Sequence, residues 1–440
     1  MQRALAALLT LAAAACVSRD AVDEEALMDP VRCAGCHPDQ YRQWSGSMHA
    51  YASDDPVFVA LEGFGQQDTD GTLGTLCMGC HAPMAVWAGA ADHGAELADL
   101  PRAYRGVTCY TCHQIDRADG EANGALHYAG DQPMRGSLGD PVDTPAHPQM
   151  YEPLLDSTRT GSSAGCGPCH DVALPGVDIE RTYAEWQDSL FAGGAAALSC
   201  SACHMPGADA PAAAVAGAPV RRVHDHSMPG VDVALTPWPE MEAQRAAVAR
   251  DLDDAISTRL CVVPGDAGLD VSVTLDNLLV GHKWPSGVTH ARRAWVELAA
   301  WQDGRDQPVY ASGLPAEGEA VIGSDPDLWL LATHFLDADG APVPVPWRAA
   351  EVTGELLPYA VTADRSDPRF YHAVTRTYRI ASGADRITLH LRIQPVGYDI
   401  LDLLISLDRL DPAVRDRMPT FEVTQGAREW RLSNGYGCVP

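Results

Sequence analysis

The chain has 440 residues, which corresponds to two or three domains at roughly 150 residues per domain. It is 46% hydrophobic and 20% charged, so it can bury a core, and this composition excludes a disordered or collagen-like chain. The net charge of −28 disfavours nucleic acid and anionic membrane surfaces as partners, because both would repel the protein. The content of 13 Cys and 16 His excludes an ordinary enzyme with incidental thiols.

The first 16 residues combine Arg3 with a run of Ala and Leu over 4–15. This run is too short for a bilayer, which needs about 20 residues, so we interpret 1–16 as an export signal. Cys16 is similar to the lipidated cysteine of bacterial lipoproteins; the alternative is ordinary signal cleavage with Cys16 incidental. We expect a periplasmic or outer-membrane lipoprotein of a Gram-negative bacterium, with a possible lipid anchor as its only membrane attachment and an acidic linker over 17–30.

Residues 31–235 contain five Cys-x-x-Cys-His strings, here called the first to fifth strings in chain order. Two thiols can form thioethers with the vinyl groups of a c-type haem, and an imidazole one residue later can reach its iron. One helical turn places positions i, i+3 and i+4 on one face, so the spacing follows from geometry. Redox disulfides and zinc sites do not require the trailing His, which all five strings have. The sequence predicts five covalent haems, with thioethers at Cys33, Cys36, Cys77, Cys80, Cys109, Cys112, Cys166, Cys169, Cys200 and Cys203, and proximal iron ligands at His37, His81, His113, His170 and His204.

The segment CAGCHPDQYRQWSGSMHA at 33–50 resembles the first haem site of the cytochrome c554-like multihaem family. LCMGCHAPM and GVTCYTCHQI resemble the second and third sites of that family, and the surroundings of the fourth and fifth strings resemble its larger bacterial relatives. The resemblance covers about 31–230. The chain departs from the four-haem members by its fifth string and its large C-terminal region, so the resemblance implies a function only as a class.

A second imidazole on the far side of a haem iron closes the site and suits electron transfer, whereas an open position admits a substrate. The resemblance implies that His49 is such a distal ligand. On similar grounds His147, upstream of the fourth string, and His226, shortly after the fifth, are predicted distal ligands, with His224 as the alternative to His226. The further candidates are His93, His127 and, in the segment GHKWPSG, His282.

Beyond the strings, 236–260 is predicted to be a connecting helix, because Ala, Val and Leu recur there every three or four residues. From 261 to 440, alternating apolar and polar segments separated by turn signals predict an antiparallel β-sandwich. The segment 398–410 is compatible with a helix or a buried strand. The expected fold is therefore α+β in two domains, a mostly irregular and helical multihaem domain followed by a β-sandwich.

Cys261 and Cys438 belong to no string and flank the expected β domain. In an oxidising compartment two such thiols favour a disulfide; the alternative is a pair of buried free thiols.

Five haems attached within residues 31–235 must lie close together. The sequence therefore favours an electron-transfer protein without catalytic residues. Its partners would be redox proteins, chiefly other cytochromes, and no nucleic acid. The alternative is a multihaem oxidoreductase that acts on a small nitrogen or sulfur compound at one open haem. A partner-binding role of the β domain, with the haems serving it, ranks lowest because a packed sandwich needs no ligand.

Overall fold

The computed structural model describes most of the chain after its N-terminal segment. The expected export signal, the lipidation site at Cys16 and the first part of the acidic linker lie outside the described residues. Within the described part, no helix is both long and apolar enough to cross a membrane. The described residues are 24–142, 144, 146–266, 268–316, 318–321, 325–381 and 383–439.

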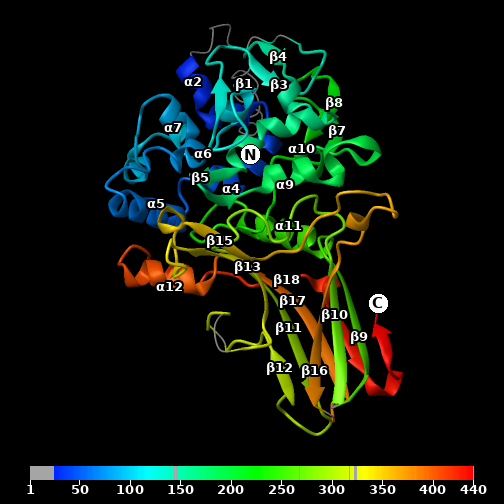
Figure 1. Ribbon diagram of the computed structural model, residues 1–440. Helices are drawn as coiled ribbons and strands as arrows, with labels where there is room; N and C mark the ends of the chain where they lie inside the picture. Colours follow the sequence, from blue (N-terminus) through cyan, green and yellow to red (C-terminus); the bar gives the residue numbers. More distant parts are fainter. Residues whose placement is uncertain are drawn as a thin grey trace, which may run out of the picture. The chain divides into compact units, whose positions relative to one another are not determined.

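The chain folds into two compact units, and each unit takes more than one stretch of sequence (Figure 1). The stretch Ala173–Phe191 lies between the fourth and fifth strings, yet it belongs to the second unit with the C-terminal strands. Backbone hydrogen bonds such as Leu190 N–H to the Ala360 carbonyl oxygen, at 2.8 Å, hold it there. The division therefore differs from the expected boundary at 235/236. The first unit contains residues up to Val172, Ala192–Pro229 and Thr236–Gln244, and the second contains Ala173–Phe191, Gly230–Leu235 and Arg245 onward.

Short helices in the first unit carry the strings. Three of the strings form a single α-helical turn each, in α6, α8 and α10. Side chains cap two of these turns: Thr108 and Thr111 form a capping box before α8, and Ser199 accepts a hydrogen bond from Ala202 N–H at 3.1 Å before α10. The α-helices of this unit are α2 (Glu24–Met28), α3 (Pro38–Ser45), α4 (Met48–Tyr51), α5 (Pro56–Asp68), α6 (Met78–His81), α7 (Pro83–Trp87), α8 (Cys109–His113) and α10 (Cys200–His204).

The first and fourth strings are built from 3-10 turns instead. The first string begins in η1 (Pro30–Gly35), and the fourth spans η5 (Thr160–Gly165) and η6 (Gly167–Cys169). In both, the N–H of the string His still bonds to the carbonyl oxygen of the first Cys, at 2.8 Å for His37 and 3.2 Å for His170. The turn that the spacing predicts is therefore present in all five strings.

Strands in the first unit are short and lie in two-stranded pairs. β1 (Ile115–Ala118) pairs with β2 (Leu126–Tyr128), and β3 (Met134–Gly136) pairs with β4 (Gln149–Tyr151). β7 (Gly207–Pro211) pairs with β8 (Val220–His224), while β5 (Val172–Leu174) and β6 (Val177–Glu180) form a pair at the start of the second unit. The apolar clusters of the first unit are small, which is consistent with a core completed by prosthetic groups.

Besides the β5–β6 pair, the described part of the second unit contains two larger antiparallel sheets. One has the strand order β16-β10-β9-β20. The other has the order β14-β13-β11-β17-β18, and in it β12 also pairs with β11, β15 with β13 and β19 with β17. Both sheets contribute to one apolar core, for example through Val273 and Leu389. The strands are β9 (Ser257–Gly265), β10 (Gly268–Asp276), β11 (Arg293–Trp301), β12 (Tyr310–Ser312), β13 (Trp329–Leu336), β14 (Pro342–Val343), β15 (Glu351–Glu355), β16 (Val374–Ala381), β17 (Arg386–Gln394), β18 (Phe421–Glu422), β19 (Arg428–Arg431) and β20 (Gly437–Val439).

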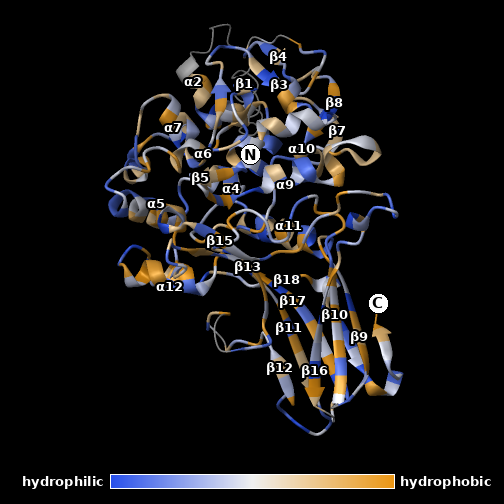
Figure 2. Cartoon of the chain, in the orientation of Figure 1, coloured by the Kyte–Doolittle hydropathy of each residue, from blue (hydrophilic) through white to orange (hydrophobic). Residues whose placement is uncertain are grey.

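The period-two pattern read from the sequence is visible along the strands. In β17, every second side chain is buried, and hydrophobic and hydrophilic colours alternate along β10 (Figure 2). The fold is thus α+β with a largely antiparallel C-terminal part, as predicted. The finer description of that part as a sandwich stays a prediction.

Two segments differ from their expected bounds or were ambiguous. The predicted helix over 236–260 is shorter, because α11 covers Met241–Asp253 and the chain has already entered β9 at Ser257. The segment 398–410 forms α12 (Tyr398–Ser406), which is followed by α13 (Pro412–Arg415). Ile400, Leu401 and Leu404 recur at helical spacing in α12 and are buried.

Cys261 and Cys438 form a disulfide in the structure. Cys261 lies in β9 and Cys438 in β20, and the two residues are directly paired in the antiparallel register. Their Cα atoms lie 3.8 Å apart, well inside the limit of about 7 Å for a bridge. The bond therefore ties the last strand of the chain to the first strand of the second unit's sheets.

Candidate haem-binding site

The cysteines of different strings lie beside one another. Cys33 of the first string hydrogen-bonds to Cys109 of the third. Cys80 of the second bonds in the same way to Cys169 of the fourth. The fold therefore gathers strings that lie far apart in sequence, which is the condition for haems at short distances from one another.

A further sulfur contact joins the fourth string to the fifth, since the Cys166 thiol bonds to the sulfur of Cys200. Nine of the ten string cysteines carry thiols, as thioether formation requires. Cys36 is the exception, because its sulfur is in a disulfide that a thioether would replace.

His147 lies opposite the proximal His37 of the first string. Their ring centroids are 6.4 Å apart and their planes are inclined by 36°. Two metal–nitrogen bonds of about 2 Å, each followed by about 1 Å from nitrogen to ring centre, would place opposed imidazoles about 6 Å apart. The spacing of His37 and His147 thus fits one iron between them.

His49 lies opposite His170 of the fourth string in the same manner. Their ring centroids are 6.2 Å apart, and their planes are nearly perpendicular at 84°. The family resemblance implied that His49 is a distal ligand, and His147 was predicted on similar grounds; His49 follows the first string in sequence and His147 precedes the fourth. The structure exchanges these neighbours: His49 faces the fourth string and His147 faces the first.

Hydrogen bonds orient several of these imidazoles. An imidazole that donates from Nδ1 to a carbonyl oxygen is in the tautomer whose Nε2 lone pair can bind a metal. Such partners also fix the plane of the ring. They are found at His81 with Ala52 (3.0 Å), His113 with Arg135, His204 with Pro229 (3.1 Å), His147 with Pro148 (3.1 Å) and His226 with His224 (2.8 Å).

Burial and electrostatic repulsion keep the imidazoles of His49 and His37 neutral. Burial, followed by repulsion from His170, lowers the pKa of His49 to about 4. Burial, followed by repulsion from His147, does the same for His37. Because only neutral imidazole binds a metal, these residues are in the required protonation state at neutral pH.

His226 lies near His113 of the third string. Burial and then the neighbouring imidazole of His113 lower its pKa to about 4. The alternative residue His224 lies in the wall of a cavity of about 600 Å³ that adjoins α10 through Ala202. Its Nε2 is 3.3 Å from the Ser157 hydroxyl, so it bonds to a side-chain oxygen there.

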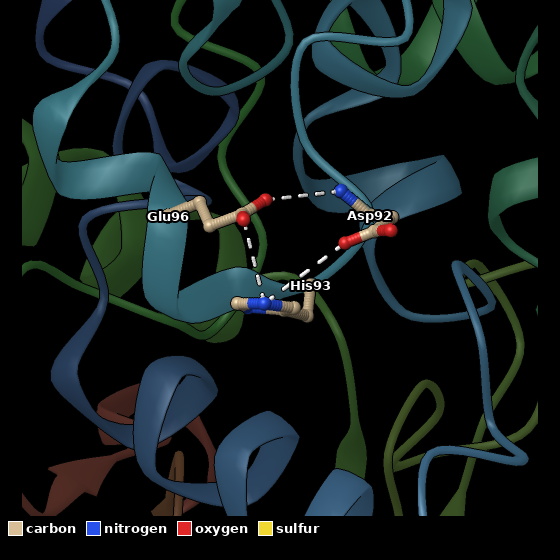
Figure 3. A group of neighbouring side chains, drawn as sticks. All are labelled: Asp92, His93 and Glu96. Carbon is tan, nitrogen blue, oxygen red and sulfur yellow. Dashed lines mark hydrogen bonds and ion pairs between the residues drawn. The ribbon is translucent and has the colours of Figure 1, made fainter.

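Two further candidates have carboxylate partners. His93 lies in an exposed group with Asp92 and Glu96, with 3.4 Å between its Nε2 and a Glu96 oxygen (Figure 3). His127 Nδ1 is 2.6 Å from the Asp116 carboxylate. A carboxylate beside a His is also how proteins strengthen imidazole ligands, so the geometry at His127 fits metal binding better than that at His93, whose Nε2 itself meets the acid.

His282 belongs to the second unit, where its loop is firmly held. Asn277 donates to the His282 carbonyl oxygen at 2.7 Å. The buried Glu185 carboxylate accepts from Lys283 N–H at 3.1 Å and from the Ser286 hydroxyl at 2.9 Å. Burial raises the pKa of Glu185, while these donors and Lys283 oppose the rise. The role of His282 as a ligand stays a prediction.

Two residues beside the predicted ligands, Phe58 and Arg102, were not among the predicted site residues. Phe58 stacks on the imidazole of His81, with ring centroids 4.0 Å apart and planes 3° from parallel. Arg102 contacts the helix that carries His49. Neither residue stands at a fixed spacing from a string, so the sequence contained no signal for them.

Two comparisons with known proteins bear on this site. Residues 32–114, which include the first three strings, match the family model described as cytochrome c554 and c-prime. The fold is similar to the crystal structure of a penta-heme cytochrome c552 from Thermochromatium tepidum, with a TM-score of 0.61 and 21% sequence identity over 91% of this chain and 97% of that one. These findings support a multihaem c-type cytochrome with covalently bound haem. No curated protein matches the sequence.

Proposed function

We propose that the protein is an exported pentahaem c-type cytochrome that carries electrons from haem to haem. The proposal rests on the proximity of the strings to one another. Cysteines of different strings are in contact in pairs, and imidazoles of the strings face further imidazoles at about the distance of two ligands on one iron. When bound, the haems supply one-electron chemistry. The chain attaches the haems, holds them close to one another and supplies a second imidazole ligand to their irons.

Within this proposal, His147 and His37 hold the first iron, and His49 and His170 hold the fourth. Two neutral imidazoles keep an iron six-coordinate in both oxidation states, so little geometry changes on electron transfer. His226 is the proposed distal ligand of the third iron because His113 is its neighbour. His93, His127, His224 and His282 remain candidates for the other two irons.

The proposed partners are other redox proteins. The net charge of −28 favours a partner with a cationic docking surface and raises the association rate at low ionic strength. Location in the periplasm, or attachment to the outer membrane by a lipid at Cys16, is the part of the proposal that rests on the sequence alone.

The first prediction concerns the number of haems. Protein produced with the complete haem-attachment machinery should have the mass of the processed polypeptide plus five haems, because each string offers two thiols and one imidazole. Intact-mass spectrometry under denaturing conditions measures this directly. A matched variant, C200A/C203A, should lose one haem only; a wild-type protein that carries four or fewer would contradict the proposal.

The electron-transfer role is tested by the state of the irons. A protein whose haem irons each have two imidazole ligands should show low-spin ferric spectra and should bind almost no carbon monoxide when reduced. A dominant high-spin ferric signal with carbon monoxide binding would instead support an oxidoreductase with an open haem.

A further inference from the structure

The imidazole of His49 is carried by α4, a helix of only four residues. Isolated helices of this length are unstable in water, so the position of the ring depends on what holds the helix. Ser47 caps it: its hydroxyl accepts from Ala50 N–H at 3.3 Å and donates to the Trp44 carbonyl oxygen at 2.7 Å. The cap secures the start of the helix but leaves its last carbonyl groups without intrahelical partners.

Those carbonyl groups are satisfied by three residues from two separate parts of the first unit. The His49 carbonyl oxygen accepts from Val107 N–H at 2.8 Å. The Ala50 carbonyl oxygen accepts from the Arg102 guanidinium. The Ala52 carbonyl oxygen, one residue past the helix, pairs with His81 Nδ1 at 3.0 Å. The backbone around His49 is therefore connected to the second string and to the segment that enters the third.

Arg102 is the central side chain of this arrangement. Its guanidinium lies 5.0 Å from the Trp238 ring and 5.7 Å from the Trp44 ring, within the range of cation–π attraction to both. It also donates to the Asp54 carboxylate at 2.7 Å. The side chain is only 26% exposed, so these partners offset the loss of hydration that burial imposes.

The close approach of the chain at Gly106 adds a second constraint. Gly106 has a left-handed backbone conformation with φ of +72°, and a Cβ there would lie 2.7 Å from the Ala50 carbonyl oxygen and 2.8 Å from that of His49. The glycine thus allows the segment from Arg102 to Val107 to lie directly against α4. Trp44 closes the contact, since its Nε1–H donates to the Val107 carbonyl oxygen at 2.7 Å.

We propose that Arg102 is a positioning residue that holds α4 so that His49 faces His170. The inference rests on the proposed function, because it assumes that His49 is an iron ligand. Arg102 touches no ligand atom of its own; it acts through the Ala50 carbonyl group, the Trp44 and Trp238 rings and Asp54. Without it, the Ala50 carbonyl group loses its charged donor, and His49 can leave the iron.

The test compares R102A with R105A in the haem-loaded protein. Arg105 pairs with the same carboxylate of Asp54 and has nearly the same exposure, 27% against 26%, which makes it the matched control. For R102A we expect the fraction of fourth irons that lack His49 to rise roughly tenfold or more, the effect of losing a hydrogen bond to a charged group. The readouts are carbon monoxide binding by the reduced protein and the high-spin signal of the oxidised protein. R105A should leave both as in the wild type.

A purely structural role for Arg102 would lower the melting temperature without opening one particular iron. The paramagnetic resonance signal of the His37–His147 iron should therefore persist in R102A, with five haems still attached. R102K retains a charge but not the planar fork, and it should give an intermediate result. It also serves as the decisive variant if R102A fails to fold.

Three results would overturn the inference. If R102A and R102K both carry five haems and show no open iron, Arg102 does not position His49. If R105A opens the iron as strongly as R102A, the ion pair with Asp54 is responsible instead. If H49A itself opens no iron, the ligand assignment in the proposed function fails, and the role of Arg102 fails with it.

Discussion

Replacing His49 by alanine should open the fourth iron and leave the first iron closed. The expected result is binding of one carbon monoxide per reduced protein and one new high-spin ferric signal, because His170 would lose the imidazole that lies opposite it at 6.2 Å. Optical titration with carbon monoxide and paramagnetic resonance spectroscopy measure the two quantities. The matched variant is H147A, which should open the first iron to the same extent.

The two variants can be told apart by the signals that they remove. The His49 and His170 planes are inclined by 84°, and perpendicular imidazoles give a strongly axial low-spin signal with one large g value. The His37 and His147 planes are inclined by 36°, which gives a more rhombic signal. H49A should abolish an axial signal and H147A a rhombic one. The opposite assignment would mean that each His serves the string nearest to it in sequence, and the pairing proposed above would be wrong.

Removing the disulfide in C261S/C438S should produce a large loss of stability. The bond closes a loop with a sequence separation of 177, and the chain-entropy model assigns about 5 kcal/mol of unfolding free energy to a loop of that length. The bond also ties β20, and with it the C-terminus, to β9. Denaturant unfolding followed by far-ultraviolet circular dichroism measures the change in unfolding free energy.

Thiol reductant supplies the control for this variant. Haem thioethers resist such reductants, so treatment of the wild type should break the disulfide alone and lower its stability to that of C261S/C438S. The variant should be insensitive to the reductant, and its haem spectra should match those of the wild type. An unchanged unfolding free energy in both cases would show that the bond contributes nothing to stability.

The sequence alone determined the chemistry of attachment and the secondary structure that attachment needs. The trailing His of each string implies a turn that brings it back over the first Cys, and that turn is present even where the helix is of the 3-10 type, as at His37 and His170. The alternation of apolar and polar residues in the C-terminal region likewise predicted strands such as β17, in which every second side chain is buried. These features are local: they depend on spacings of two to four residues, which backbone geometry fixes.

Such short spacings do not predict which segments of the chain belong to each of the two units. Ala173–Phe191 follows the fourth string immediately, yet it belongs to the second unit because Leu190 bonds to Ala360 and Glu185 bonds to the loop at 283–286. The predicted helix over 236–260 was too long for a related reason. Its last residues enter β9, where pairing with β10 outweighs helical periodicity.

Only the tertiary structure decided which imidazole faces which string. His49 is close to the first string in sequence and His147 to the fourth, but the packing of α4 against Arg102, Gly106 and Val107 turns His49 toward His170, and His147 lies opposite His37. A string determines its proximal ligand because both lie in one turn of backbone. A distal ligand lies across the iron, so its identity depends on contacts between segments distant in sequence, and no local pattern records those contacts.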